Sequence, residues 1–256
     1  MSAHSYSSDF YKYIDAGSRE SAQVVSSLLL GELRIDSLLD VGSGHGAWSR
    51  IWLDAGVQDV VAVDGAYIDE GQLVVPPPCF RSHDLSKPLD LERSFDLVQS
   101  LEVAEHISED CADTFIDNLV RHGDVILFSA AVPRQGGEHH VNEQPPEYWR
   151  RKFMKRGYHP YDWLRPRLAG NGAVKPWYRF NSFLYVNGSG GSKLSESILS
   201  AKVPNNEPLQ IGGDFRWALR RAAVRLIPTA LVKPVAMAKA SVEARFRRES
   251  STPWGE

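Results

Sequence analysis

The segment SLLDVGSGHGAW, residues 37–48, places Gly42, Gly44 and Gly46 at alternate positions directly after a short apolar run. At a junction between a strand and a helix, backbone N–H groups face a polar ligand, and glycine removes the side chains that would block its approach. The spacing also fits the loose pattern GxGxx[GA], with Ala47 in last place, so a dinucleotide remains an alternative ligand. A purely structural turn is the other interpretation.

Three aspartates stand where a nucleoside cofactor would need them. Asp64 ends the next expected strand, 18 residues after Gly46, and a carboxylate there can accept two hydrogen bonds from ribose hydroxyls. Asp40 precedes Gly42 by two residues; it can hold the amino group of a methionine moiety, whereas it would repel a pyrophosphate. Asp84 in FRSHDL can accept a hydrogen bond from an adenine amino group, or it is a turn or helix N-cap residue. The set favours S-adenosylmethionine over NAD.

Two groups of acidic residues and histidines follow two later strands of the expected sheet. They are Glu102, Glu105 and His106 after the fourth strand, and Glu138, His139, His140 and Glu143 after the fifth. Neighbouring parallel strands end at the same edge of a sheet, so we expect the two groups to meet beside the cofactor's methyl group. If the first segment is helical, its spacing of i, i+3 and i+4 places all three side chains on one face.

Three interpretations of these groups compete. In the first, Glu105 and His106 only hydrogen-bond to loops and shape the pocket. In the second, His140 or His139 is a general base, since an imidazole with a pKa near ~6.5 can remove a proton from the acceptor at neutral pH. In the third, which we do not favour, Glu102, Glu105, His106 and His140 bind a divalent metal such as Mg, Mn or Zn.

Short apolar runs separated by helical segments predict βαβ units and therefore an α/β fold with a mostly parallel sheet. The expected strands are residues 37–41, 60–64, 80–82, 95–100 and 125–129, and the expected helices are residues 19–33, 45–56, 66–73, 108–121 and 145–157. The segments 158–164 and 179–186 follow as two more strands with no clear helix between them. They predict a hairpin at the sheet edge with an antiparallel last strand.

The chain changes character after Val186, where NGSGGSK has the composition of a flexible linker. We therefore predict a domain over residues 1–187 and a basic helical extension over residues 188–256. The extension holds eleven Lys and Arg against six Asp and Glu. In DFRWALRRAAVRLIP, helical geometry lines Phe215, Leu219, Ala222 and Leu226 on one face and arginines on the other. A peripheral membrane or protein contact is an interpretation of this face, and nucleic acid is the least favoured partner.

Whole-chain properties point to an ordinary globular protein. The 256 residues are 43% hydrophobic with a net charge of −3, enough for one large domain with a core. Cys79 and Cys111 lie far apart and form no disulfide framework, which fits a reducing compartment. The first residues lack a signal-peptide core, and there is no run of about 18 apolar residues that would span a membrane. We expect a cytoplasmic location.

The motifs LLDVGSGHGAW, VVAVDG, DL and FDLVQSLEVAEHI together resemble the class I S-adenosylmethionine-dependent methyltransferases over about residues 19–187. Within them the chain is similar to a bacterial group with GSRESA before the first strand and RHGDVILFSAAVPRQGGEHHVNEQPPEYW after the fourth. The resemblance implies a Rossmann-like seven-stranded sheet with a reversed last strand and helices on both faces. The cofactor-binding residues expected on these combined grounds are Asp40, Gly42, Ser43, Gly44, Gly46, Asp64, Gly65, Asp84, Leu85, Ser100, Leu101 and Glu102. Of these, the resemblance places Ser100, Leu101 and Glu102 at the methionine end.

The resemblance and the residues together predict methyl transfer from S-adenosylmethionine to an oxygen, or next a nitrogen, of a small molecule or glycan. Because the positive sulfur already activates the methyl group, the enzyme would mainly align donor and acceptor. The pattern ExxEH…H is also similar to metal-dependent small-RNA 3′-end methyltransferases, so a metal-dependent RNA 2′-O-methyltransferase is an alternative. An NAD-dependent oxidoreductase and a non-catalytic binding module acting through the basic extension are the remaining alternatives.

Overall fold

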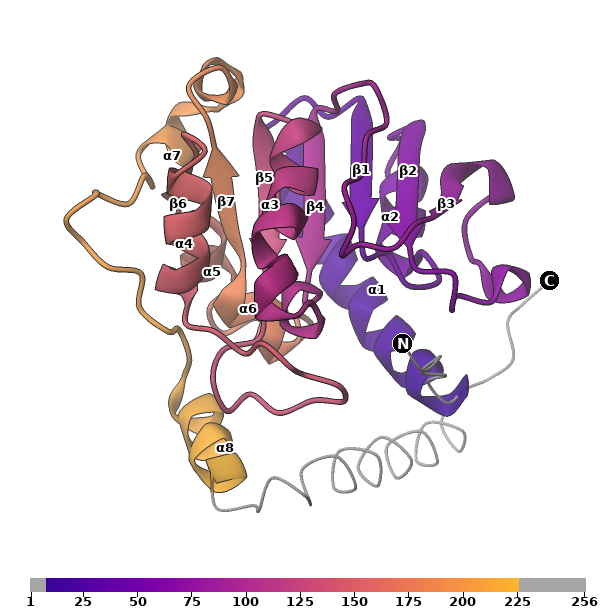
Figure 1. Ribbon diagram of the computed structural model, residues 1–256. Coiled ribbons are helices and arrows are strands. Elements are labelled where there is room, and N and C mark those ends of the chain that lie inside the picture. The colour runs from indigo at the N-terminus through magenta and orange to yellow at the C-terminus, as the bar shows by residue number, and fades with distance from the viewer. Residues whose placement is uncertain (1–7, 226–256) are drawn as a thin grey trace.

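The computed structural model describes residues 8–225, and they form a seven-stranded sheet in the order β3-β2-β1-β4-β5-β7-β6 (Figure 1). The strands are β1 (Ser37–Val41), β2 (Asp59–Asp64), β3 (Phe80–Ser82), β4 (Leu97–Leu101), β5 (Val125–Ser129), β6 (His159–Tyr161) and β7 (Phe183–Val186). Strands β1 to β5 pair in parallel, whereas β7 is antiparallel to both of its neighbours, β5 and β6. The predicted seven-stranded α/β sheet with a reversed last strand is confirmed.

The connection between β6 and β7 differs from the tight hairpin that we expected. Two short helices, α5 (Leu164–Leu168) and α6 (Pro176–Asn181), lie between the two strands. Neither helix completes two turns, so neither shows the repeating apolar pattern by which a helix is recognised in a sequence. Helix α6 ends at Asn181, and β7 begins two residues later at Phe183.

Helices cover both faces of the sheet, as predicted. The longer ones are α1 (Ser8–Leu30), α2 (Ala47–Asp54), α3 (Ala112–Arg121) and α4 (Pro146–Met154). Helix α1 begins earlier than the expected residue 19. The expected helix over 66–73 is wrong: only a 3₁₀ turn, Glu70–Gln72, forms there, after Asp69 accepts a hydrogen bond from the Gly71 amide at 3.0 Å. A side chain that caps a turn in this way competes with helix propagation.

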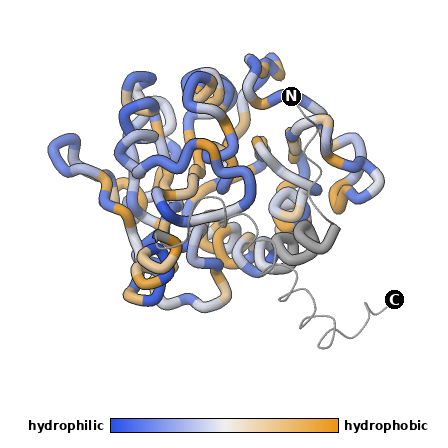
Figure 2. The backbone as a smooth tube through the Cα atoms, turned by 60° about the horizontal axis from the view of Figure 1, so that its bottom comes forward, coloured by the Kyte–Doolittle hydropathy of each residue, from blue (hydrophilic) through white to orange (hydrophobic). Residues whose placement is uncertain are grey.

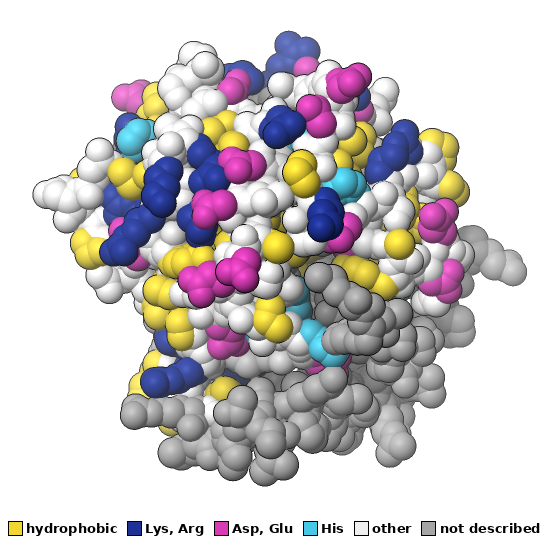
Figure 3. Space-filling model, in the orientation of Figure 1, with side chains coloured by type: hydrophobic (Ala, Val, Ile, Leu, Met, Phe, Trp, Pro, Cys, Tyr) yellow, Lys and Arg dark blue, Asp and Glu magenta, His cyan; other side chains and the backbone are white. Residues whose placement is uncertain are grey.

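Two apolar clusters pack against the opposite faces of the sheet because successive strand residues point to opposite sides. Leu38 of β1 belongs to the cluster with α1 and α2, and Leu39 belongs to the cluster with α3 and α4. In Figure 2 the hydrophobic segments run through the middle of the molecule, and hydrophilic segments form most of the outer loops. On the outer face of α3 and α4, acidic and basic side chains alternate (Figure 3), and Asp113 pairs there with Lys152 and Arg156.

The residues after β7 are folded onto this domain rather than forming the flexible linker that their composition suggested. The Gly190 amide donates to Asn187 Oδ1 at 2.8 Å, and the turn Gly190–Lys193 leads into α7 (Glu196–Leu199). Leu194 and Ile198 join the core on the α1 face. Further on, the buried Arg150 of α4 donates Nη2 to the Pro204 carbonyl at 2.8 Å and Nη1 to that of Glu207. The predicted division after residue 187 stays a prediction.

The last described helix is α8 (Phe215–Arg225), and the remainder of the extension, with Leu226, lies outside the described residues. Within residues 8–225, no helix combines the length and the apolar character needed to cross a membrane.

Candidate functional site

The loop after β1 turns sharply on three glycines. Gly42, Gly44 and Gly46 have φ angles of 86°, 57° and 89°, in the left-handed region that favours glycine. A Cβ atom on Gly42 would overlap the Val103 side chain, so this glycine lets the loop after β1 approach the loop after β4. A Cβ atom on Gly44 would meet no atom within 4 Å, so the side of the loop at Gly44 is open to a ligand.

Asp64 at the end of β2 joins the neighbouring loops. Its Oδ2 accepts a hydrogen bond from the Gly44 amide at 2.7 Å, and its Oδ1 accepts from the Gly65 amide at 2.6 Å and from the Tyr67 hydroxyl. The Tyr67 ring covers Gly65, yet the tyrosine is 55% exposed. Burial raises the pKa of Asp64, although these hydrogen bonds oppose the change. A ribose could use the carboxylate fully only after the tyrosine hydroxyl moves away.

Asp40 is buried in β1 and turns toward α2, where its Oδ2 accepts a hydrogen bond from Ser49 Oγ at 2.6 Å. Burial raises its pKa to about 6, and the Ser49 hydrogen bond opposes this. Ser100 of β4 is also buried, and its Oγ has no hydrogen-bond partner among the described residues. The neighbouring Leu101 is partly buried and pairs with Ser129 of β5.

The segment after β3 forms a turn at Asp84, which was the alternative to a contact with adenine. Asp84 is exposed, and its Oδ1 accepts hydrogen bonds from the amide and hydroxyl of Ser86 at 3.1 and 2.6 Å. The side chain of Leu85 lies in the apolar core. Ser43 donates its backbone amide to the Val63 carbonyl at 3.2 Å. The cofactor roles expected for these residues stay predictions.

Glu102 leaves β4 with a left-handed backbone, φ 57°, and its amide donates to the carbonyl oxygen of Ser129 at 3.0 Å. The amide groups of Gln135 and Asn181 donate to its two carboxylate oxygens. Burial raises the pKa of Glu102, and the hydrogen bonds oppose that rise. Sequence reasoning missed Gln135 as a site residue; its only signal is its place in PRQGGEHH, just before the predicted histidines.

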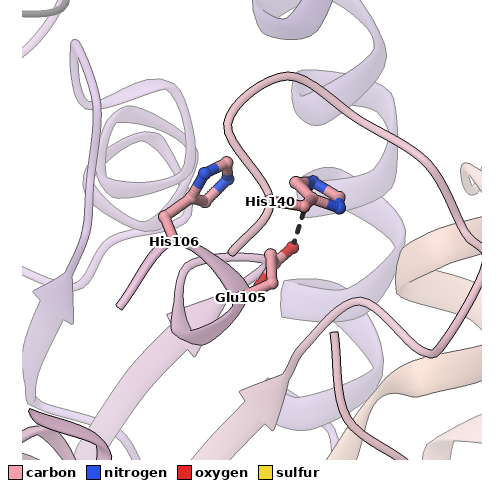
Figure 4. A group of neighbouring side chains, drawn as sticks. All are labelled: Glu105, His106 and His140. Atoms are coloured by element: carbon pink, nitrogen blue, oxygen red, sulfur yellow. Dashed lines mark ion pairs between the residues drawn. The ribbon is translucent and has the colours of Figure 1, made fainter. Parts of the chain in front are cut away.

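Glu105, His106 and His140 form one cluster (Figure 4). The Glu105 carbonyl accepts hydrogen bonds from the amides of Val141 and Asn142 at 2.9 and 3.0 Å, which fastens the two loops together. The two groups therefore meet, as predicted; their place beside the cofactor's methyl group stays a prediction. The segment after β4 is not an α-helix but a single 3₁₀ turn, Ala104–His106, so the condition for placing Glu102 on one face with the other two is not met.

The hydrogen bonds orient both imidazole rings. His140 Nδ1 lies 2.8 Å from Glu143 Oε1, and its Nε2 lies 3.9 Å from Glu105 Oε1. His106 Nδ1 lies 3.3 Å from the His139 carbonyl oxygen, so His139 contributes its backbone here. When each Nδ1 carries the proton, each Nε2 has a free lone pair.

A potential ligand atom from each of Glu105, His106 and His140 lies within 4.8 Å of the other two. Glu102 is not part of this group; its two carboxylate oxygens accept hydrogen bonds from the side-chain amides of Gln135 and Asn181. Glu105 Oε2 is buried without a hydrogen-bond partner among the described residues. Three of the four residues of the metal interpretation are thus together.

Burial also sets the charges of the cluster. It raises the pKa of Glu105 well above its ordinary value, and the neighbouring Glu102 adds to the effect. Burial lowers the pKa of His106 to about 3, helped by repulsion from His140, so His106 is neutral at physiological pH. The pKa of Glu143 is lowered: burial alone would raise it, but hydrogen bonds from His140 and two backbone amides outweigh that effect. The site therefore offers the ionised carboxylate of Glu143, the neutral imidazole of His106 and the Glu105 carboxyl group, which favours its proton.

A comparison with models of protein families and with curated proteins finds no match. Solved structures match in fold. Streptomyces venezuelae DesVI is 13% identical over 70% of this chain and 95% of that chain, with a TM-score of 0.51. Magnesium protoporphyrin IX methyltransferase from Synechocystis, solved with bound S-adenosylmethionine, is 20% identical over 72% of this chain and 86% of that chain, with a TM-score of 0.49.

An S-adenosylmethionine-dependent methyltransferase from Clostridium acetobutylicum also matches, with 18% identity over 47% of this chain and a TM-score of 0.38. The match spans 53% of the Clostridium chain. The match to DesVI extends over most of the length of that chain. The chain has the Rossmann-like fold of the class I S-adenosylmethionine-dependent methyltransferases.

Proposed function

We propose that the protein binds S-adenosylmethionine and transfers its methyl group to an oxygen, or a nitrogen, of a small molecule or glycan. The observation that carries the proposal is the contact between two loops at one edge of the sheet. Val103 fills the space beside Gly42, so the glycine loop lies against the turn that bears Glu105 and His106. A cofactor on the glycine loop would lie next to groups that can handle an acceptor's proton.

The residues at this edge fit the cofactor. The open side of Gly44 leaves room for it, Asp64 offers a carboxylate to the ribose, and Asp40 and Ser100 are buried polar groups near the methionine end. S-adenosylmethionine supplies a methyl group on a positively charged sulfur. The protein's part is to bind and orient it; the buried carboxylates favour a cation.

His140 is suited to act as the general base. Its Nδ1–H donates to the ionised Glu143, which fixes the ring and leaves Nε2 free to accept a proton from an acceptor hydroxyl or amine. Gly137 permits this position, because a Cβ atom there would overlap the His140 ring. Gln135 and Asn181 hold Glu102 beside the cluster and so position the wall of the acceptor site.

Calorimetric titration with S-adenosylmethionine, S-adenosylhomocysteine and NAD tests the cofactor. We expect the first two to bind and Asp64→Ala to weaken both at least ~10-fold, the loss of hydrogen bonds to a charged group. Asp59→Ala, at the other end of β2 with an exposed ion pair to Arg93, is the matched control and should bind normally. Binding of NAD alone would overturn the proposal in favour of an oxidoreductase.

A second candidate is a metal-dependent methyltransferase, including one that acts on an RNA 2′-hydroxyl. It is favoured by the closeness of the Glu105, His106 and His140 ligand atoms and by the unpartnered Glu105 Oε2. A carboxylate with two imidazoles suits Mn²⁺ or Zn²⁺. Titration with Mn²⁺ and an activity assay with a chelator distinguish the two candidates. Micromolar Mn²⁺ binding that is lost in His106→Ala, together with loss of activity in the presence of the chelator, supports the metal-dependent enzyme. Activity that is indifferent to chelator leaves His140 as the base.

A further inference from the structure

Helix α8 exposes an apolar face. Trp217 is only 3% exposed, and its ring centroid lies 6.0 Å from that of Phe180 on α6. Phe215 and Leu219 are 80% and 58% exposed. Ala218, Ala222 and Ala223 are exposed as well, and so is the basic residue Arg216. A helix on the surface of a water-soluble domain ordinarily shows the opposite arrangement, with its apolar stripe toward the core.

The orientation of α8 is fixed by specific contacts. Asp214 caps the helix, since its Oδ1 accepts from the Trp217 amide at 2.8 Å. Arg221 donates Nε and Nη2 to the Pro133 carbonyl oxygen at 3.2 and 3.1 Å. Phe215 and Leu219, predicted from the sequence to lie on one apolar face, point outward because Trp217 and Arg221 hold the other side of the helix.

The charge of the segment restricts what can cover this face. Residues 215–242 contain six Lys and Arg and no Asp or Glu. In the space-filling view, hydrophobic and basic side chains adjoin at the lower left, where Figure 1 places α8 (Figure 3). The same face of a second copy, or residues 226–256 with five basic residues against three acidic ones, would bring like charge to the face. An anionic bilayer complements both the apolar residues and the positive charge.

We propose that α8 docks the protein on anionic lipid bilayers, with Phe215 and Leu219 inserted at the level of the headgroups and Arg216 beside them. The docking helix borders the acceptor side of the candidate site. It holds Pro133, two residues before Gln135, and its Trp217 packs on Phe180, next to Asn181. A bilayer bound by α8 therefore lies beside the segments that position Glu102.

Co-sedimentation of the full chain with vesicles tests the proposal. We expect binding to phosphatidylcholine vesicles that contain phosphatidylglycerol, little binding to phosphatidylcholine alone, and weaker binding at higher salt. F215S/L219S should weaken binding about 100-fold, roughly tenfold for each apolar side chain withdrawn from the interface. The matched control is Leu199→Ser, which replaces a 43% exposed leucine on α7 and should bind like the wild type. Thermal melts confirm that the variants are folded.

Three outcomes would overturn the proposal. In the first, the wild type does not bind the anionic vesicles. In the second, F215S/L219S binds them as well as the wild type, and binding is then due to charge alone. In the third, sedimentation equilibrium finds a wild-type dimer that F215S/L219S converts to a monomer, with no vesicle binding, so that a second copy covers the face. None of these readouts depends on methyl transfer, and failure of the proposed enzymatic function leaves them unchanged.

Discussion

Replacing Asp40 by Asn should make the protein more stable at neutral pH and poorer at binding S-adenosylmethionine. Asp40 is 3% exposed, and its Oδ2 accepts a hydrogen bond from Ser49 Oγ. Its pKa is about 6 in the folded protein, against an ordinary 3.8, because burial disfavours the charge. Above pH 6 the folded protein must therefore hold an ion that the unfolded chain holds at lower cost.

The size of the effect follows from the two pKa values. The folded state binds the proton more tightly, so the stability due to this group is present below pH 3.8 and is lost as the pH rises through about 6. The full loss is about 3 kcal/mol at pH 7.5 and about 1 kcal/mol at pH 4.5. Asparagine is never charged and can still accept from Ser49, so Asp40→Asn should gain these amounts.

Urea denaturation at the two pH values measures this gain. Asp36→Asn, at a side chain that is 64% exposed, is the control and should change stability by less than about 0.5 kcal/mol. If Asp40→Asn is no more stable than the wild type at pH 7.5, the argument from burial is wrong. In calorimetry, the same variant should bind S-adenosylmethionine about 10–100-fold more weakly, as expected when an amino group loses a charged partner. Unchanged affinity would refute that role for Asp40.

Three further predictions concern other parts of the chain. Tyr67→Phe should bind S-adenosylmethionine up to about 10-fold more tightly in calorimetry, because no hydroxyl then occupies Asp64; weaker binding would mean that the hydroxyl serves the cofactor. Arg150→Met should lower the free energy of unfolding in urea by about 3 kcal/mol, since it leaves carbonyls of the C-terminal segment without their buried charged donor; a loss below about 0.5 kcal/mol would contradict this. Glu143→Gln should lower kcat about tenfold and leave calorimetric cofactor affinity intact, because His140 loses its orienting carboxylate; an unchanged kcat would argue against the base.

Most of the fold is predictable from the sequence because the strands are continuous apolar runs bounded by turns. The predicted strands 37–41, 80–82 and 125–129 match the structure to the residue. The helices that the sequence did not predict are short. Helices α5 and α6 are five and six residues long, and a helical repeat of apolar residues can be recognised only over more turns than that. The residues after β7 were misjudged because glycine and serine composition predicts flexibility, whereas Asn187 and the core contacts of Ile198 hold them in place.

The parts of the site that follow from the strand topology could be predicted from the sequence. The parts that depend on contacts of single side chains could not. Parallel strands bring the loops after β4 and β5 together, so the meeting of Glu105 with His140 could be foreseen. The hydrogen bonds that hold the Glu102 carboxylate could not be foreseen. They depend on the left-handed backbone of Glu102 and on the side-chain amide of Asn181 in α6, 79 residues away. The outward orientation of Phe215 and Leu219 on α8 could not be predicted either. A helical pattern separates two faces, but it does not show that the face with Trp217, rather than the face with several smaller apolar residues, packs on the domain.

Within the part of the chain that the structure describes, the carboxyl groups with raised pKa values all lie at one edge of the sheet. They are Asp40, Asp64, Glu102 and Glu105. Each lies at or just after the end of β1, β2 or β4; Asp40, Asp64 and Glu105 are buried and Glu102 is half-buried, and loss of solvent is the main cause of each shift. Such groups cost stability when ionised, so a fold selected for stability alone would have apolar residues in their place. A cationic ligand would offset the cost by favouring the ionised forms, and S-adenosylmethionine carries its positive sulfur and amino group to this edge under the proposed function. The instability of the edge and its capacity to bind such a cofactor therefore have the same physical origin.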